Sequence, residues 1–272
     1  MPSRSYSEVA YGEDARVEWF GKEKLEMQRV NSLANLPYIR DGDTIVTQSN
    51  SCLLHLGMRL GIDTPALLIR NHQAMDQTMD LRNETMKIAY GPAGSDWKPA
   101  LERHLAKAAG HFMKLEGFCM GPYMCGSAPQ SGDFHVFEMV DQHVKMAAES
   151  SLTFDLNGSY PKLAALHAKL KAEPALASYF ASDAYCTFAV NNPQYANYVG
   201  SGYGSGPFGP TIRREVTLGG GKGGGKGKGG KEGAAKGPAQ QAKQTPEEKA
   251  AKEAAKAREK LLKAVIKEGG KK

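Results

Sequence analysis

Residues 35–50 read NLPYIRDGDTIVTQSN, and this stretch decides the fold. Two short apolar runs flank the turn residues DGD at 41–43, and an Asp-Gly pair between such runs predicts a β-hairpin. The apolar segment SCLLHLGMRLGI follows. Ser49 or Asn50 is a natural side-chain N-cap for a helix there, and Gly61 is a natural end for it. The stretch therefore predicts a strand pair that runs directly into a helix.

The sequence on either side separates a small α/β unit from an all-helical one. Upstream, residues 6–11 are typical of a strand. Downstream, Thr64-Pro65 gives an N-cap and a first-turn proline, and apolar residues then recur at helical spacing. The predicted helices are a long one from Pro65 to Gly91, one at 96–116, one at 134–148 and two short ones broken before Pro174.

Charge is divided unevenly along the chain. The 272 residues are 41% hydrophobic and carry a net charge of +6, and this length suits one or two compact domains with extensions. From Gly219 onward there are 15 Lys/Arg and 6 Asp/Glu, which leaves 20 basic and 23 acidic residues before it. We therefore expect a mildly acidic body and a basic tail that is attracted to polyanions.

Composition also predicts where the chain divides. Residues 219–244 are rich in Gly, Lys and Ala and are predicted to be disordered. Thr245-Pro246-Glu247-Glu248 then predicts the start of a basic helix. The predicted segments are an α/β domain at 1–62, a helical domain at 63–195, a linker at 196–244, a basic helix at 245–268 and a short end at 269–272.

Cysteines, histidines and apolar runs limit the class of protein. The four cysteines form no C-x-x-C pair, and the seven histidines show no ligand spacing with them. We therefore expect neither a disulfide framework nor a metal site. The N-terminus lacks an apolar signal core, and no apolar run approaches the ~18 residues of a membrane span. We expect a soluble cytoplasmic protein with no bound cofactor.

The runs NLPYI (35–39) and TQSN (47–50) are together similar to the glutathione-site signature of mu-like glutathione transferases. The resemblance extends from Trp19 to about Pro193. It implies a thioredoxin-like N-terminal domain and an all-helical C-terminal domain. It also implies glutathione and a hydrophobic electrophile as substrates, with glutathione a substrate and not a cofactor.

In that family the proline is cis, and the residue before it presents backbone groups to the cysteinyl part of glutathione. The Gln-Ser pair holds the γ-glutamyl carboxylate at a helix N-terminus. A Trp…Lys pair contacts the glycine end, and an Asp reaches across a dimer to the glutathione amine. Carried over, the glutathione-binding positions are Trp19, Lys22, Asn35, Leu36, Pro37, Gln48, Ser49 and Asp80.

Several of these positions keep a second interpretation. The lysine spacing departs from the family pattern by one residue, so Lys24 can replace Lys22, or Trp19 is a packing residue beside solvated lysines. In its second interpretation, Asp80 is one of several acidic residues on a solvent-exposed helix face. Asp133 is expected to serve as a cap residue beside Gln130. The aromatic residues Tyr90, Tyr179, Phe180, Tyr185 and Phe188 either line an electrophile pocket or belong to the core.

The resemblance also implies a homodimer. We expect it to form through the helix that begins at Pro65 and the one that contains Trp97. The methionines at positions 75, 79 and 86 would supply its adaptable apolar contact.

The catalytic residue is not found. In the mu-like family, a Tyr in the first strand donates a hydrogen bond to the glutathione sulfur and favours the thiolate. This chain resembles the family only from the second strand onward. Tyr6 and Tyr11 are expected to be structural residues of that strand and not catalytic ones. Because the missing strand is an inner one, we expect repair in trans or a reorganised domain, unless the sequence is incomplete.

Two functions follow from this pattern. One is conjugation of the glutathione thiolate to electrophilic small molecules, impaired by the missing Tyr. The alternative is a non-catalytic transferase-like assembly module whose basic tail binds nucleic acid or another polyanion. The catalytic residue stays unassigned under both.

Overall fold

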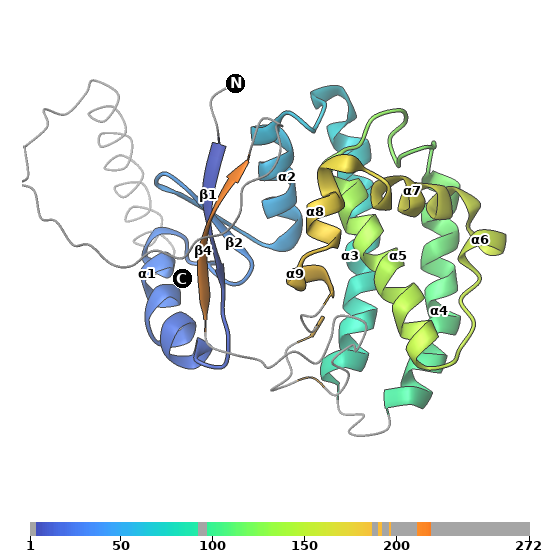
Figure 1. Cartoon of the computed structure of the whole chain (residues 1–272), viewed down its shortest axis with the longest axis horizontal. Coiled ribbons are helices and arrows are strands. Elements are labelled where there is room, and N and C mark those ends of the chain that lie inside the picture. The colour runs from blue at the N-terminus through green and yellow to red at the C-terminus, as the bar shows by residue number, and fades with distance from the viewer. Residues whose placement is uncertain (1–3, 92–96, 187–189, 192–195, 197–210, 219–272) are drawn as a thin grey trace, which may run out of the picture. The chain divides into compact units, whose positions relative to one another are not determined.

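The computed structural model describes residues 4–91, 97–186, 190–191, 196 and 211–218. Within them a small α/β unit precedes a helical bundle, as the sequence predicts (Figure 1). The predicted low-complexity segment 219–244 and the predicted helix 245–268 lie outside the described residues. None of the described helices combines the length and the apolar character that a membrane crossing requires.

The α/β unit contains the predicted hairpin and the helix that follows it. In the hairpin, Tyr38 pairs with Thr47 and Asp41 with Thr44. Gly61 takes a left-handed φ of 72° at the end of the helix, as glycine does at helix C-termini. The elements are β1 (Arg4–Ala10), the π-helix η1 (Arg16–Glu23), α1 (Lys24–Val30), β2 (Tyr38–Asp41), β3 (Thr44–Thr47) and α2 (Ser49–Leu60).

The core of this unit is built around Trp19, which is fully buried. Its ring stacks on Tyr38 at 5.4 Å between centroids and lies 5.3 Å from Tyr11. Met27 and Ile45 complete the cluster from α1 and β3. One tryptophan therefore joins β1, η1 and the hairpin.

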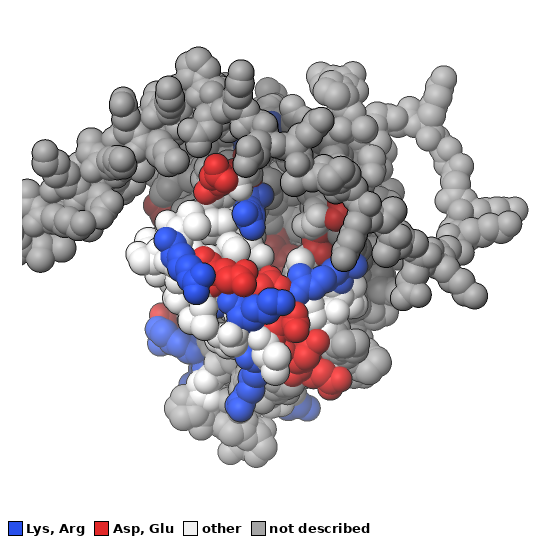
Figure 2. All heavy atoms as spheres, turned by 90° about the vertical axis from the view of Figure 1, so that its left-hand side faces the viewer, with Lys and Arg blue, Asp and Glu red and all other residues white. Residues whose placement is uncertain are grey.

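The surface over η1 and α1 carries charges of both signs. The segment RVEWFGKEKLEMQRV (16–30) mixes basic and acidic residues with little separation. Figure 2, which faces the α1 side of Figure 1, shows Lys/Arg and Asp/Glu interleaved there. The visible described part of this face therefore offers no broad surface of one sign to a polyanion.

The bundle packs α3 against both α4 and α5, around a core that includes Phe112, Val140 and Leu163. Met75 on α3 is fully buried within the bundle, so of the three methionines predicted to supply a dimer contact it is not available to a partner. The elements are η2 (Pro65–Leu67), α3 (Leu68–Tyr90), α4 (Trp97–Phe118), α5 (Ser131–Glu149), α6 (Leu156–Ser159), α7 (Pro161–Lys171), η3 (Pro174–Leu176), α8 (Ala177–Phe180) and α9 (Asp183–Cys186).

The start of α5 confirms the predicted cap. Gln130 is the N-cap residue and forms a capping box with Asp133. The fully buried Asp133 carboxylate accepts the backbone N–H groups of Gln130 and Met124, both at 2.7 Å. The two contacts tie the loop before α5 to its first turn.

Of the predicted aromatic residues, Phe180 and Tyr185 belong to the core, whereas Tyr179 and Tyr90 are exposed. Phe180 packs against the main cluster, and the buried Tyr185 hydroxyl donates to Asp141 at 2.7 Å. Burial raises the pKa of Asp141, but hydrogen bonds from His167, Tyr185 and Lys145 outweigh it and lower the pKa well below its usual range. Phe188 lies outside the described residues.

A strand that the sequence did not predict follows the bundle. It is β4 (Ile212–Leu218), which pairs antiparallel with β1 from Ala10↔Ile212 to Arg4↔Leu218. The hairpin β2–β3 forms a separate two-stranded sheet. In the described part of the chain, β1 therefore finds its partner in the same molecule, and the α/β unit is reorganised.

Candidate functional site

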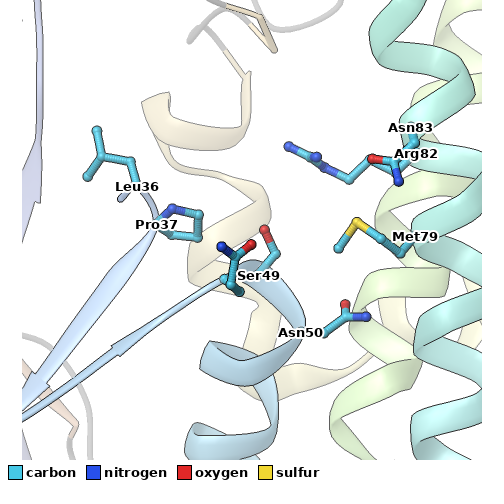
Figure 3. Close-up of a pocket in the computed structure, with 8 residues that line it drawn as sticks. Leu36, Pro37, Ser49, Asn50, Met79, Arg82 and Asn83 are labelled. Atoms are coloured by element: carbon cyan, nitrogen blue, oxygen red, sulfur yellow. The ribbon is translucent and has the colours of Figure 1, made fainter. Parts of the chain in front are cut away.

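A cavity of about 410 Å³ lies between the hairpin–α2 region and α3 (Figure 3). The predicted residues Leu36, Pro37, Gln48 and Ser49 all line it, so the fold brings half of the predicted binding set together. The remaining lining residues are Asn50 on α2 and Met79, Arg82 and Asn83 on α3.

The N-terminus of α2 opens into this cavity. Gln48 is the N-cap residue, and its side chain makes no capping hydrogen bond. This corrects the prediction that Ser49 or Asn50 caps the helix, because both lie in its first turn. The Asn50 amide instead donates to Asp76 at 3.3 Å. First-turn N–H groups and the positive end of the helix dipole attract an anion.

Gln48 itself is held in a strained backbone conformation. Its φ of 75° and ψ of 130° lie in a region that L-residues rarely occupy. Such a conformation costs on the order of 1–3 kcal/mol and is found most often at ligand-binding positions. The strain makes the junction of β3 and α2 a candidate functional position.

The opposite edge of the wall is held by buried Thr47. Its hydroxyl oxygen lies 2.7 Å from the carbonyl oxygen of Asn35 and 3.2 Å from that of Pro37. The Leu36–Pro37 peptide bond is cis, as predicted. Thr47 was not among the predicted site residues, although the inward positions of the hairpin, Ile45 and Thr47, follow the strand period of two.

Cys52 is the thiol near this wall, and it is not a reactive one. Its Sγ faces the carbonyl oxygen of Pro37 at 3.8 Å and that of Val46 at 3.6 Å. Burial raises the pKa of the Cys52 thiol, so the thiolate is disfavoured. Cys52 is therefore not suited to act as a nucleophile at this site.

The residues predicted for the glycine end lie away from the cavity lining. Trp19 is in the core, as its packing interpretation expects, and Lys22 is exposed. Lys24 Nζ lies 3.5 Å from Asn35 Oδ1, beside the wall. Lys24 is thus placed closer to the site than Lys22, and the binding roles of Trp19, Lys22 and Asn35 remain predictions.

Arg82 is the charged residue among the four lining residues that were not predicted, the others being Asn50, Met79 and Asn83. Its side chain extends from α3 toward the side that carries Pro37 and Ser49 (Figure 3). It is partly buried, and no hydrogen bond or ion pair joins it to another described residue. The sequence feature that could have indicated Arg82 is its spacing: it follows Met79 by three residues, so the two side chains lie about one helical turn apart on the same face. A guanidinium with unused donors is suited to an anionic ligand.

Asp80 stands beside this face without lining the cavity. It is exposed on α3, next to Met79. Exposure is compatible both with a reach to a second copy of the chain and with a solvated helix face. Its role across a dimer remains a prediction.

No tyrosine lines the cavity within the described residues. Tyr6 is 47% exposed on β1, opposite Val216. The Tyr11 hydroxyl donates to Glu23, and burial together with this hydrogen bond raises the pKa of Tyr11 far above its usual value. Both tyrosines serve the β1 region, as predicted, and the catalytic residue stays unassigned.

The comparisons with known proteins agree with one another. The family described as "Glutathione S-transferase, C-terminal domain" matches residues 79–183. Glutathione S-transferase Mu 3 of Homo sapiens is 27% identical over 184 residues, which cover 65% of this chain and 75% of that protein. Glutathione S-transferase Mu 2 of Rattus norvegicus is 33% identical over 113 residues, 40% of this chain and 50% of that protein.

A solved structure supports the same fold. The glutathione S-transferase Blo t 8 aligns with a TM-score of 0.53 and 20% sequence identity, over 64% of this chain and 81% of that one. The order of the α/β unit and the bundle is thus that of a thioredoxin-like domain followed by a transferase-type helical domain. The family match and the curated relatives thus support a mu-like glutathione transferase family for this chain, and the solved structure supports the fold.

Proposed function

We propose that the cavity binds glutathione as a substrate. The cysteinyl backbone lies along Leu36–Pro37, and the γ-glutamyl carboxylate lies at the N-terminus of α2, on Gln48 and Ser49. The observation that carries this proposal is that the first turn of α2 opens into the cavity with no cap from the Gln48 side chain. A helix N-terminus and a serine hydroxyl are a suitable pair of donors for a carboxylate.

Titration calorimetry with the full chain tests this assignment. Ser49→Ala removes a hydroxyl hydrogen bond to a charged group, worth roughly 1.5–3 kcal/mol, and is expected to weaken glutathione binding about 10- to 150-fold. Ser51→Ala is the matched control, because Ser51 is exposed on the same turn and does not line the cavity. Equal losses in both variants, or none in either, would reject the carboxylate position.

The reaction we propose is the family's conjugation. The thiol proton leaves to solvent, and the thiolate forms a carbon–sulfur bond with a hydrophobic electrophile beside Met79. In a substitution, the bond from that carbon to its leaving group breaks and the leaving group departs with the electron pair. In an addition, a π bond of the electrophile breaks and the neighbouring atom takes a proton from solvent. Because no tyrosine hydroxyl lines the described cavity, one hydrogen bond to the sulfur is missing. That loss corresponds to roughly a 10- to 150-fold lower rate than in a family member that has the hydroxyl. A chromogenic-electrophile assay measures the conjugation rate. A rate typical of the family would contradict the view that no hydroxyl of this chain bonds to the glutathione sulfur.

The alternative proposal is a non-catalytic assembly module. It is favoured by the same lack of a tyrosine and by the concentration of basic residues after Gly219. The η1–α1 face carries both signs, so polyanion binding falls to the tail (Figure 2). Glutathione binding without measurable turnover, together with tail-dependent RNA binding, would favour this alternative.

We also propose a cytoplasmic homodimer that uses α3 and α4. With Met75 in the core, the apolar contact must come from other exposed side chains, such as Ile69 on α3 and Met113 on α4, which are 75% and 64% exposed. Sedimentation at micromolar concentration tests the dimer. A monomer would remove the role of Asp80 across the interface.

A further inference from the structure

The pairing of β4 with β1 is fastened at one end by Thr211. The Gly12 N–H donates to the Thr211 hydroxyl at 3.2 Å, and the Thr211 N–H donates to Asp14 Oδ1 at 2.9 Å. The Thr211 hydroxyl also contacts that carboxylate. Hydrogen bonding from Thr211 lowers the pKa of Asp14. Residues nearly 200 positions apart in sequence thus share one hydrogen-bonded corner.

Arg213 fastens the same strand to η1. Its guanidinium donates to Glu18 Oε2 at 3.1 Å and to Glu23 Oε1. Burial raises the pKa of Glu23, but the hydrogen bonds from Tyr11 and Arg213 outweigh it, so the pKa of Glu23 is lowered. One arginine therefore satisfies two carboxylates that would otherwise repel each other across one turn of η1.

These contacts lead to the wall of the cavity. Glu18 and Glu23 flank Trp19 in η1, and Tyr11 bonds to Glu23 while its ring packs on Trp19. Trp19 stacks on Tyr38, which directly follows the cavity residue Pro37. A continuous series of packed rings and hydrogen bonds thus joins β4 to the cavity.

A two-stranded ribbon has little stability of its own. Described side chains on both strands, such as Ser5, Tyr6, Arg213 and Glu215, are exposed. The polar contacts of Thr211 and Arg213, together with the hydrogen bond from Ser7 to Glu215 across the strands, therefore favour this segment as the partner of β1.

We propose that residues 211–218 form a latch in cis that replaces a neighbouring strand for β1 and, through η1 and Trp19, positions the Leu36–Pro37 side of the cavity. Thr211 and Arg213 are its positioning residues. Because β4 ends at Leu218 and the lysine-rich segment begins directly after it, a ligand that pulls on the tail acts on the latch first. The link to the cavity rests on the proposed glutathione site, whereas the latch itself does not.

Hydrogen exchange of the full-length protein without glutathione tests the latch. Arg213→Glu places a third carboxylate beside Glu18 and Glu23 and is expected to speed exchange of the β1 and η1 amides about tenfold. Exchange in α5 is expected to stay unchanged, which shows that the bundle remains folded. Arg29→Gln is the matched control, because Arg29 is exposed on α1 and makes no ion pair with a described residue.

A charge swap makes the test specific. Adding Glu18→Arg to Arg213→Glu restores an opposite-charge pair and is expected to return most of the lost protection. If Arg213→Glu leaves β1 exchange unchanged, or if the swap fails to restore it, the latch is rejected. Glutathione titration of the same variants then reports the link to the cavity. Faster exchange with unchanged affinity would reject that link and leave the latch standing.

Discussion

Replacing Arg82 tests whether the cavity stabilises a negative charge on the sulfur of bound glutathione. In the proposed orientation, the helix N-terminus at Ser49 already serves the carboxylate, so the guanidinium across the cavity is left for the sulfur. A positive charge near a thiol favours the thiolate. Under the proposed function, Arg82 would therefore supply part of the thiolate stabilisation that a tyrosine hydroxyl provides in the mu-like family.

The expected magnitude follows from the burial and the partners of Arg82. It is partly buried and makes no hydrogen bond or ion pair with another described residue, so its donors are available to a ligand. A charge-assisted hydrogen bond of this kind is worth roughly 1.5–3 kcal/mol, which corresponds to about one to two pKa units for the thiol. Arg82→Gln is therefore expected to raise the pKa of bound glutathione by that amount.

The assay is an ultraviolet titration of the thiolate in the complex at saturating glutathione. Arg82→Lys keeps the charge and is expected to keep most of the pKa shift. Arg103→Gln, at an exposed position of α4, is the matched control. The unfolding free energy of Arg82→Gln is expected to change by less than about 0.5 kcal/mol, because no described contact is lost.

Two outcomes would refute this reasoning. An unchanged thiol pKa with unchanged affinity would show that Arg82 does not face the ligand. An unchanged pKa with an affinity that falls at every pH would place Arg82 at the carboxylate and contradict its assignment to the sulfur.

Three other perturbations have expected outcomes. Asp133→Ala leaves two buried N–H groups without an acceptor and is expected to cost about 3 kcal/mol in denaturant unfolding; a loss under about 1 kcal/mol would contradict its role. Burial lowers the pKa of His104 to about 4 and that of His143 to about 3, so the unfolded state binds more protons between about pH 6.5 and 4. Stability is expected to fall over that window by on the order of 2 kcal/mol per histidine, and a flat profile would contradict the buried neutral pair. A chain that ends at Leu218 is expected to lose low-salt RNA binding, which equal affinity of both chains would contradict.

The hairpin and the start of α2 were predictable because their signals are local. The turn at 41–43 sets the register of β2 and β3, and Pro37 and Ser49 are fixed to that hairpin within a few residues. The ligand expected at this site, glutathione, came from the family resemblance, because sequence periodicity does not indicate a ligand. The helical bundle was predictable from apolar periodicity for the same local reason.

What the sequence did not reveal depends on contacts between distant segments. Nothing in residues 211–218 says that their partner is β1, although Ile212 and Val216 fit strand alternation. Arg82 looks like any polar residue of a helix until α3 is placed across from Pro37. The expected cap at Ser49 or Asn50 was wrong because both residues lie inside the first turn of α2, and Gln48 takes the N-cap position.

Under the proposed function, binding of glutathione and stabilisation of its thiolate would therefore be separable. The groups suited to a carboxylate, at Ser49 and the start of α2, belong to one continuous segment whose geometry is set by the hairpin and by Thr47. The group suited to a sulfur anion, Arg82, comes from a different element, where its charge also acts on Glu138 of α5. A mutation in the hairpin should therefore reduce affinity and rate together, because it displaces the whole ligand. A mutation of Arg82 should change the fraction of thiolate, and with it the rate, while affinity for the protonated ligand changes little.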